Sequence, residues 1–507
     1  MQMKRAVIFL LLLCMLGTGI LSSCATKKPS GNNETVETKP SDTTNAEEEG
    51  LFPKIRDDMP STMDFGAKKV RMAVRSNERF YSEFNTESGG VLSDALYERI
   101  LNIEDRLNIQ IEICPDINST HGPWENISNS IMTGSCTYQV AAGSSYKAAS
   151  FAMQGEYRNL RNLEHLNFEK AYWSQGMIEN LTVADATYFA TGSLSTYFWD
   201  SAYVIYFNKQ LASNYDIDAA ALYQKVLDGA WTLDEMLEVS KGVYLDLNHN
   251  GVEDDGDLFG FGIQVTSATD GFWSAFDIRN TELTEDGNIR YMLDVEKLDD
   301  VVSRLNRFVW EQSGTVALSE NAGYASTNVY ELKNQFASDQ IMFLTDLLYR
   351  TSTSAMRDMK SDYGVLPYPK YDTTQESYRS FVHDQMTIFG VPVTVSDSEL
   401  EMVGAFLEAM ASEGQNTVMP VYYKKVLTSR NIRDLQSVKT LDIILSSIAV
   451  DRIWFYNYSV GRINNVLLRE QVWNNKNEIS STYRSNYETV NNLLLTVREK
   501  YEKYKDR

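Results

Sequence analysis

An alternation of strand and helix patterns near the start of the chain constrains the fold most. Short apolar runs at 70–74, 109–114 and 138–142 predict strands. Two amphipathic helical patterns, at 92–107 and 124–132, separate these runs. Strands that alternate with helices are typical of a parallel sheet covered by helices, so we predict an α/β fold.

A second series of similar elements follows, which indicates a second lobe. Further strands are expected in short apolar runs at 203–207, 341–344, 364–366 and 386–391. An amphipathic helix is expected at 398–411, and a long helical pattern covers 472–501. A chain of 507 residues is long enough to fold into two or more lobes.

The N-terminus has the layout of a secretory signal. Basic residues precede an apolar run at 7–16 that is too short to span a bilayer as a stable helix. The sequence Leu21-Ser-Ser-Cys24 resembles a bacterial lipobox, so we expect a signal peptide at 1–23 and a lipid such as palmitate on Cys24. The alternative is an ordinary cleaved signal with a chance cysteine.

The residues after Cys24 are typical of a tether. Residues 25–50 are mostly polar and contain no apolar side chain larger than Val36. Such a segment cannot bury enough apolar surface to offset the entropy lost on ordering. We therefore expect 24–64 to form a lipid anchor and a disordered stalk, which hold the folded part at the outer face of the cytoplasmic membrane.

Composition and motifs argue against several classes of protein. The net charge of −22 argues against nucleic acid as a partner. The four histidines show no metal-ligand spacing, and no nucleophile elbow, phosphate loop or dinucleotide-binding fingerprint occurs, so we do not expect an enzyme. A glycoside hydrolase needs only two carboxylates, and the 69 acidic residues leave that alternative open.

Two cysteines lie outside the signal region, and we predict that both are free thiols. Cys114 ends a predicted strand, whereas Cys136 precedes the next strand, with a helix between them. In a right-handed parallel β-α-β unit these positions lie at opposite edges of the sheet. They are then farther apart than the roughly 7 Å between Cα atoms that a disulfide can bridge.

The sharpest local motif is an acidic loop at 246–257 that is rich in Asn and Gly. Its spacing, Asp-x-Asn-x-Asn-Gly-x5-Asp, is that of an EF-hand-type calcium loop, except that the last residue is Asp instead of Glu. A solvated acidic turn without metal is the alternative, and we expect a structural Ca²⁺. Its oxygen ligands would come from Asp246, Asn248, Asn250, the Val252 carbonyl, Asp254 and Asp257.

Four features occur in one order along the chain. They are the lipobox, the strand with Asn-Lys at 203–209, the Trp-Thr-x-x-Glu helix start at 231–235, and Gly-Val-Leu-Pro-Tyr-Pro-Lys at 364–370. In this order and spacing the chain resembles the solute-binding lipoproteins of bacterial ABC importers, in the branch that includes maltose-binding protein. The resemblance covers nearly all of the chain after the signal.

The resemblance implies a two-lobed periplasmic-binding-protein-like fold, whose hinge the chain crosses three times. By analogy, lobe one would comprise 65–192 plus 345–392, and lobe two 196–340 plus 395–507. It also implies a monomer that closes around a sugar or oligosaccharide and delivers it to the membrane subunits of an ABC permease. The closest alternative is the same fold with a non-sugar solute such as a peptide.

Candidate ligand-binding residues lie at strand ends, where α/β sheets bind ligands, and at the expected hinge crossings. Sugars require aromatic platforms, and carboxylate, amide or Arg groups for their hydroxyls. The strongest candidates are Trp199, Asp200 and Trp273, because their neighbours are polar or small, although each aromatic could also be plain core. The full set is Arg75, Asn77, Glu78, Ser144, Ser145, Trp199, Asp200, Phe272, Trp273, Asp346, His383, Asp384 and Trp454.

Overall fold

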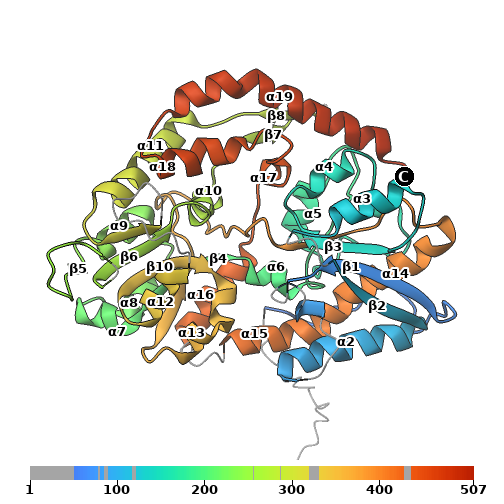
Figure 1. Cartoon of the computed structure of the whole chain (residues 1–507), viewed down its shortest axis with the longest axis horizontal. Helices are drawn as coiled ribbons and strands as arrows, with labels where there is room; N and C mark the ends of the chain where they lie inside the picture. The colour runs from blue at the N-terminus through green and yellow to red at the C-terminus, as the bar shows by residue number, and fades with distance from the viewer. Residues whose placement is uncertain are drawn as a thin grey trace, which may run out of the picture. The chain divides into compact units, whose positions relative to one another are not determined.

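Two β-sheets and their surrounding helices organise the described part of the chain (Figure 1). The expected signal peptide at 1–23, Cys24 and Glu78 lie outside the described residues. Among the residues that are described, no helix is both long and apolar enough to cross a bilayer. The computed structural model describes residues 51–77, 80, 82–84, 89–116, 121–254, 256–285, 287–318, 330–427 and 435–507.

The first sheet contains the predicted β-α-β-α-β unit. Its strand order is β12-β3-β1-β2, with β1 parallel to β2 and β3, and β12 antiparallel to β3. The prediction of alternating strands and helices in this region is confirmed. The elements are β1 (Lys68–Arg75), α2 (Val91–Leu107), β2 (Ile109–Asp116), α3 (Trp124–Met132), β3 (Val140–Ser144) and β12 (Thr387–Gly390).

Alternate residues of β1 face two different apolar clusters. Met72 lies in a cluster with the side chains of α14 (Asp397–Glu413), such as Phe406. Ala73 points to the other face and belongs to the cluster that continues into the second sheet. Helix α14 therefore covers the first sheet, which differs from the expectation that 395–507 belongs wholly to lobe two.

The second sheet has the order β11-β4-β10-β6-β5, and β9 pairs with β6 outside this path. Strand β4 runs antiparallel to both of its neighbours. Gly364 of β11 pairs with Phe207 of β4, so this strand lies in the second sheet although 345–392 was expected in lobe one. The strands are β4 (Tyr203–Asn208), β5 (Tyr244–Leu245), β6 (Leu258–Gln264), β9 (Thr315–Leu318), β10 (Ile341–Leu347) and β11 (Tyr363–Leu366).

The remaining elements surround these sheets. Thr232 accepts a hydrogen bond from Glu235 N at 3.4 Å and caps α9, as the Trp-Thr-x-x-Glu motif predicts. Strands β7 (Thr281–Leu283) and β8 (Ile289–Tyr291) form a separate hairpin. The further helices are α4 (Ala148–Ala152), α5 (Gln175–Leu181), α6 (Thr196–Asp200), α7 (Lys209–Asn214), α8 (Ala219–Leu227), α9 (Leu233–Ser240), α10 (Gly271–Ala275), α11 (Val295–Asn306), α12 (Tyr330–Ala337), α13 (Ser354–Asp358), α15 (Met419–Leu427), α16 (Leu435–Ser446), α17 (Arg452–Tyr456), α18 (Glu470–Trp473) and α19 (Ile479–Tyr504).

Residues 51–64, which were expected to belong to the stalk, contact the first sheet's helices. Asp57 is buried and forms an ion pair with Arg106 of α2 at 2.7 Å. Ile55 N donates to the side chain of Asn416 at 2.8 Å. The folded part of the chain therefore begins before the expected boundary at 65.

The long C-terminal helix α19 connects the β7–β8 hairpin to the connection that follows the first-sheet strand β3 (Figure 1). Its first half packs against β8, where Tyr291 N donates to the Asn491 side chain at 2.9 Å. Near its end, the Tyr188 hydroxyl donates to the Tyr501 carbonyl at 3.1 Å. Asn159 N, which follows the first-sheet strand β3, donates to the carbonyl of the last residue at 2.9 Å. The helix is thus attached at both ends.

Cys114 and Cys136 are free thiols. Cys114 lies in β2 and Cys136 precedes β3, and these two strands lie on opposite sides of β1. The prediction from the β-α-β order is confirmed. Burial raises the pKa of both thiols.

Candidate functional site

The segment 383–387, which we call the rim segment, lies between the carboxyl ends of strands from both sheets. Ser145, directly after β3, donates through Oγ to the Asp384 carbonyl at 2.8 Å. On the other side, His383 N donates at 2.9 Å to the carbonyl of Ser201, just before the amino end of β4, which lies beside the carboxyl end of the antiparallel β10. Ligands of α/β sheets bind at such edges, so the rim segment marks the candidate site.

A cavity of about 160 Å³ opens beside the rim segment, where β6 and β10 end. It brings together two of the predicted ligand residues, Asp346 and His383. The Asp346 carboxylate also accepts hydrogen bonds from Arg350 Nε at 2.6 Å and Leu347 N at 2.7 Å. The residues that line the cavity include Tyr203, Gln264, Ser267, Thr345, Arg350 and Gln385.

Asp384 is a half-exposed carboxylate of the rim segment. His383 Nδ1 lies 2.9 Å from Asp384 Oδ1. Burial raises the pKa of Asp384, but the charge and hydrogen bond of His383 and the charge of Arg469 outweigh it, so this pKa lies below its ordinary value. An ionised carboxylate at this edge can accept hydrogen bonds from ligand hydroxyls.

Asp270 and Arg469 form a buried ion pair beneath the rim segment. Arg469 Nε donates to Asp270 Oδ1 at 3.1 Å, and its Nη2 contacts the second carboxylate oxygen. Asp270 is 3% exposed, and burial raises its pKa. The Asp270 charge and hydrogen bond raise the pKa of Arg469 despite burial, so Arg469 stays charged, and its charge lowers the pKa of Asp384.

Arg75 is the last residue of β1, at the carboxyl end where it was expected, but its guanidinium bonds to other parts of the protein. Nη1 donates to the Gln385 carbonyl at 2.7 Å and Nη2 to Thr387 Oγ1 at 2.6 Å. Thr387 in turn donates to the buried Glu83 carboxylate at 2.5 Å, which also accepts from Ser195 Oγ at 2.5 Å. Arg75 is 2% exposed, so it positions the rim segment and does not face a ligand in this structure.

An aromatic group lies next to the rim segment. The His121 and Tyr146 rings are 4.7 Å apart, and the Tyr146 and Tyr458 rings are 5.6 Å apart. Lys147 Nζ lies 4.9 Å from the centre of the Tyr458 ring. Tyr458 is 45% exposed, so the group offers an accessible ring face, which can pack against the C–H face of a sugar.

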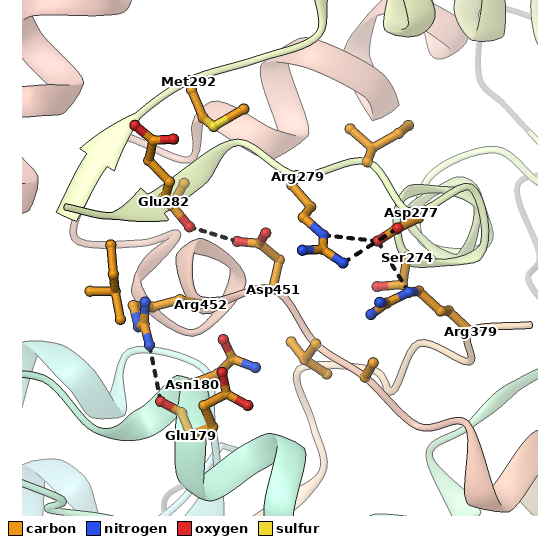
Figure 2. A pocket seen from close by; sticks show the side chains of 15 residues that line it. Glu179, Asn180, Ser274, Asp277, Arg279, Glu282, Met292, Arg379, Asp451 and Arg452 are labelled. Carbon is orange, nitrogen blue, oxygen red and sulfur yellow. Dashed lines mark hydrogen bonds and ion pairs between the residues drawn. The ribbon is translucent and has the colours of Figure 1, made fainter. Parts of the chain in front are cut away.

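A larger cavity of about 600 Å³ is lined by residues of α5, the β7 strand and α17 (Figure 2). Arg279 and Arg379 both form ion pairs with Asp277, at 3.0 and 3.1 Å. Arg452 Nη2 donates to the Glu179 carbonyl at 3.1 Å. None of the predicted ligand residues that the structure describes lines this cavity.

No family model matches the sequence, and no curated protein matches it either. Solved structures do match. The apo-form of RafE from Streptococcus pneumoniae is 13% identical, with 86% of this chain and 99% of that chain covered and a TM-score of 0.51. MalE from Bdellovibrio bacteriovorus bound to maltotriose is 13% identical, with 84% and 99% covered and a TM-score of 0.51. An ABC transporter solute-binding protein from Thermotoga lettingae bound to α-D-tagatose is 14% identical, with 84% and 100% covered and a TM-score of 0.50.

The fold is that of a solute-binding protein. The match extends over nearly the full length of each of these chains, so the predicted two-lobed α/β fold is confirmed.

Several predicted aromatic contacts belong to the core of this solute-binding-protein fold. Phe272 and Trp273 are fully buried in α10. Phe272 packs on Tyr368 with ring centres 4.8 Å apart, and Trp273 packs on the partly buried Trp454 at 6.0 Å. Phe272 and Trp273 therefore do not face a ligand in this structure, because α10 presents them to the apolar cluster that includes residues of both sheets.

The other predicted residues do not line the cavity beside the rim segment. Trp199 packs on Phe52 at 5.1 Å, and Asp200 accepts a hydrogen bond from Tyr422 at 2.7 Å. Asn77 and Asp200 line a separate cavity beside the start of α2. Ser144 is fully buried, and its Oγ has no hydrogen-bond partner within the described residues.

Sequence reasoning missed the aromatic group and the Asp270–Arg469 pair. Tyr146 directly follows the predicted Ser144 and Ser145, so the end of the β3 strand is the signal that could have found it. No local signal marks Asp270 and Arg469, because 199 positions separate the two partners.

The loop at 246–257 has the residue types of a calcium site, but many of their side-chain oxygens accept hydrogen bonds from within the loop. Asn248 and Asn250 each donate through Nδ2 to the Asp254 carboxylate, at 2.9 and 2.6 Å. Asp257 is fully buried and accepts from the Tyr244 hydroxyl at 2.9 Å.

One oxygen of this loop is left without a partner. Asp246 Oδ1 is buried and lacks a hydrogen-bond partner among the described residues. No described basic side chain forms an ion pair with the carboxylates of Asp246, Asp254 or Asp257. In the described part of the chain, the carboxylates of Asp246, Asp254 and Asp257 do not form a group whose ligand atoms all lie within 4.8 Å of one another, so the calcium ion stays a prediction.

Proposed function

We propose that this protein is a binding protein for a sugar or oligosaccharide, which it holds between its two lobes and delivers to the membrane subunits of an ABC permease. The observation that carries the proposal is the position of the rim segment. In a solute-binding-protein fold, this segment brings an ionised carboxylate, a histidine and an accessible tyrosine pair to the edge where both sheets end.

The chemistry of this edge favours a carbohydrate. Asp384 can accept hydrogen bonds from sugar hydroxyl groups, and His383 can donate one to them. Tyr146 and Tyr458 offer ring faces for sugar C–H groups. Two structures of the same fold hold carbohydrates, namely maltotriose and α-D-tagatose. Closure of the lobes around the solute would require no covalent chemistry, so we propose a binding protein and not an enzyme.

We also propose that the chain is held outside the cell by a lipid on Cys24, as a monomer. The lipobox-like sequence before Cys24 supports this placement. Mass spectrometry of the membrane-extracted protein would show the added acyl groups. An unmodified N-terminus after cleavage at another position would exclude the anchor.

A calcium ion is proposed as a structural component of the loop at 246–257. Asp246, Asn248, Asn250, the Val252 carbonyl, Asp254 and Asp257 would hold it, and a bound ion would neutralise their charge. The unpartnered Asp246 Oδ1 supports the proposal.

The solute is tested by thermal unfolding of the purified protein with a panel of mono- and oligosaccharides. A saccharide at one hundred times its dissociation constant is expected to add about 2.7 kcal/mol to the free energy of unfolding. The saccharide should be recovered unchanged, whereas shortened products would indicate a glycoside hydrolase. Stabilisation by peptides alone would favour the non-sugar alternative.

Two substitutions locate the bound sugar. Tyr146→Ala should weaken saccharide binding by about twofold to tenfold, because a stacking aromatic ring contributes roughly 0.5–1.5 kcal/mol. Tyr146→Phe is the matched control, since it keeps the ring and should bind nearly as well. Equal affinities of wild type and Tyr146→Ala would place the sugar elsewhere, for example in the cavity of Figure 2.

A further inference from the structure

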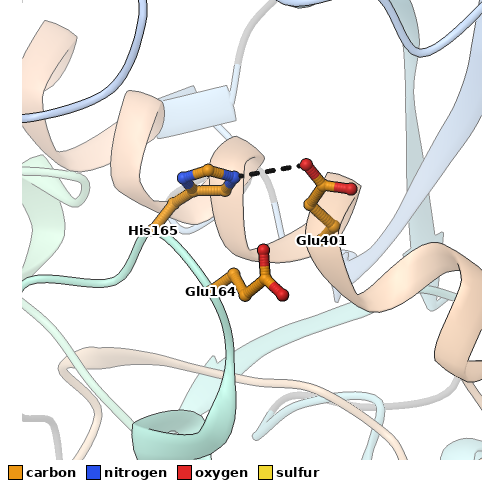
Figure 3. A group of neighbouring side chains, drawn as sticks. All are labelled: Glu164, His165 and Glu401. Atoms are coloured by element: carbon orange, nitrogen blue, oxygen red, sulfur yellow. Dashed lines mark ion pairs between the residues drawn. The ribbon is translucent and has the colours of Figure 1, made fainter.

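A second group of metal-ligand side chains lies apart from the rim segment and the acidic loop. It consists of Glu164, His165 and Glu401, which lie together in Figure 3. One nitrogen or oxygen atom of each residue lies within 4.8 Å of the others. Glu401 is on helix α14, whereas Glu164 and His165 are on the connection that follows β3.

The connection is held closely against α14. A Cβ atom at Gly404 would lie 2.2 Å from the Glu164 carbonyl oxygen, so glycine is needed for this approach. One helical turn further, the buried Glu408 accepts from Asn167 N at 3.2 Å and Trp173 Nε1 at 3.0 Å. The backbone on both sides of His165 is therefore fixed relative to the helix.

The histidine nitrogen that faces Glu401 is not used by the protein. His165 Nε2 lies 3.6 Å from Glu401 Oε1, which is an ion-pair distance but too long for a hydrogen bond. This nitrogen is buried and has no hydrogen-bond partner within the described part of the chain. The described residues also provide no Lys or Arg ion pair for Glu164 or Glu401.

We propose that Glu164, His165 and Glu401 bind a divalent transition-metal ion such as Zn²⁺. The ligand set is one imidazole nitrogen and two carboxylate oxygens, which Zn²⁺ accepts with water at a fourth position. A histidine ligand favours Zn²⁺ over Ca²⁺, which prefers oxygen ligands. In a tetrahedral zinc site the ligand atoms lie roughly 3.3 Å apart, so the exposed glutamate side chains need only rotate inward.

Such an ion would join the connection between α4 and α5 to helix α14. The hydrogen bonds of Glu408 already join the same two parts. This site does not depend on the proposed sugar-binding function, because none of its three residues lines the rim cavity. It is also distinct from the acidic loop at 246–257. That loop offers oxygen ligands and connects β5 to β6 in the second sheet.

The experiment is isothermal titration calorimetry of the purified protein with ZnSO₄. We expect His165→Asn to weaken zinc binding at this site by at least about tenfold, because loss of even an outer-sphere partner costs about 10–100-fold. Asn is chosen because it tolerates the left-handed backbone of His165, whose φ is 73°. Glu169→Gln, an exposed glutamate of the same connection, is the control and should bind zinc as the wild type does.

A second variant and a competitor make the result decisive. Glu401→Gln changes a side chain that is 56% exposed, so it should leave folding intact and weaken zinc binding in the same way. A hundredfold excess of CaCl₂ should not displace the zinc. Absence of zinc binding, equal binding by both variants and wild type, or displacement by calcium would each overturn the proposal.

Discussion

Glu408 is a carboxyl group that the fold keeps away from water. Burial raises its pKa from 4.5 to about 7, although hydrogen bonds from Tyr172, Asn167 and Trp173 favour the ionised form and offset part of the effect. In the folded chain this group therefore holds its proton at pH values where the unfolded chain has already lost it.

The shift predicts a pH dependence of stability. The contribution of Glu408 is fully present below about pH 4.5 and is lost as the pH rises towards 7, because the unfolded state then binds fewer protons than the folded state. Glu408→Gln should remove this part of the dependence. Urea unfolding at several pH values measures it, with Glu169→Gln as control, and parallel curves for wild type and Glu408→Gln would contradict the assignment.

The buried pair of Asp270 and Arg469 gives a second prediction at the residue scale. Asp270→Asn leaves the Arg469 charge without its partner and should lower the free energy of unfolding by about 3 kcal/mol. Glu282→Gln, which breaks the more exposed pair with Arg290, should cost about 1 kcal/mol or less. Denaturant unfolding measures the loss in free energy of unfolding for both variants. Equal losses would show that burial of the Asp270–Arg469 pair does not increase its contribution to stability.

Individual residues also show where sequence reasoning ends. It placed Arg75, Ser145 and Asp384 near the strand ends, and the structure brings these positions together. It could not tell that Trp273 faces the core, because residue type and polar neighbours do not determine on which side of a short helix a side chain lies. That choice depends on contacts with distant rings such as Trp454.

At the scale of elements, periodicity predicted strands and helices well but not their partners. The strand expected at 364–366 and the helix expected at 398–411 are present as β11 and α14. The strand β11 belongs to the second sheet and the helix α14 packs on the first, each the opposite of what was expected. Strand pairing and helix packing depend on apolar surfaces that are far apart in the sequence. The lobe ranges as a whole remain predictions.

The loop at 246–257 carries a prediction about metal removal. If it holds Ca²⁺, a chelator should lower the melting temperature, since calcium at one hundred times its dissociation constant adds about 2.7 kcal/mol to stability. Asp246→Asn should abolish the response to calcium, whereas the exposed Asp299→Asn should keep it. Differential scanning calorimetry is the measurement, and identical transitions with calcium and with chelator would exclude the ion.

At the scale of the whole molecule, the end of α19 joins two distant parts of the chain. Asn159 donates through Nδ2 to the Lys505 carbonyl at 2.9 Å, and Arg507 Nη1 donates to the Gly155 carbonyl at 2.7 Å. Deletion of 502–507 should remove these bonds and speed amide exchange around Asn159. Amide exchange in β8 should not change. Unaltered exchange around Asn159 would show that the end of the helix does not stabilise this region.

The attachment of α19 at both ends also limits how a solute can enter. The helix has 26 residues, which corresponds to a rod about 39 Å long. Because its first half packs against β8 and its end is bonded near Asn159, separation of the lobes at that end would break these contacts. We therefore expect the lobes to open on the side away from the C-terminus, and a solute to enter there.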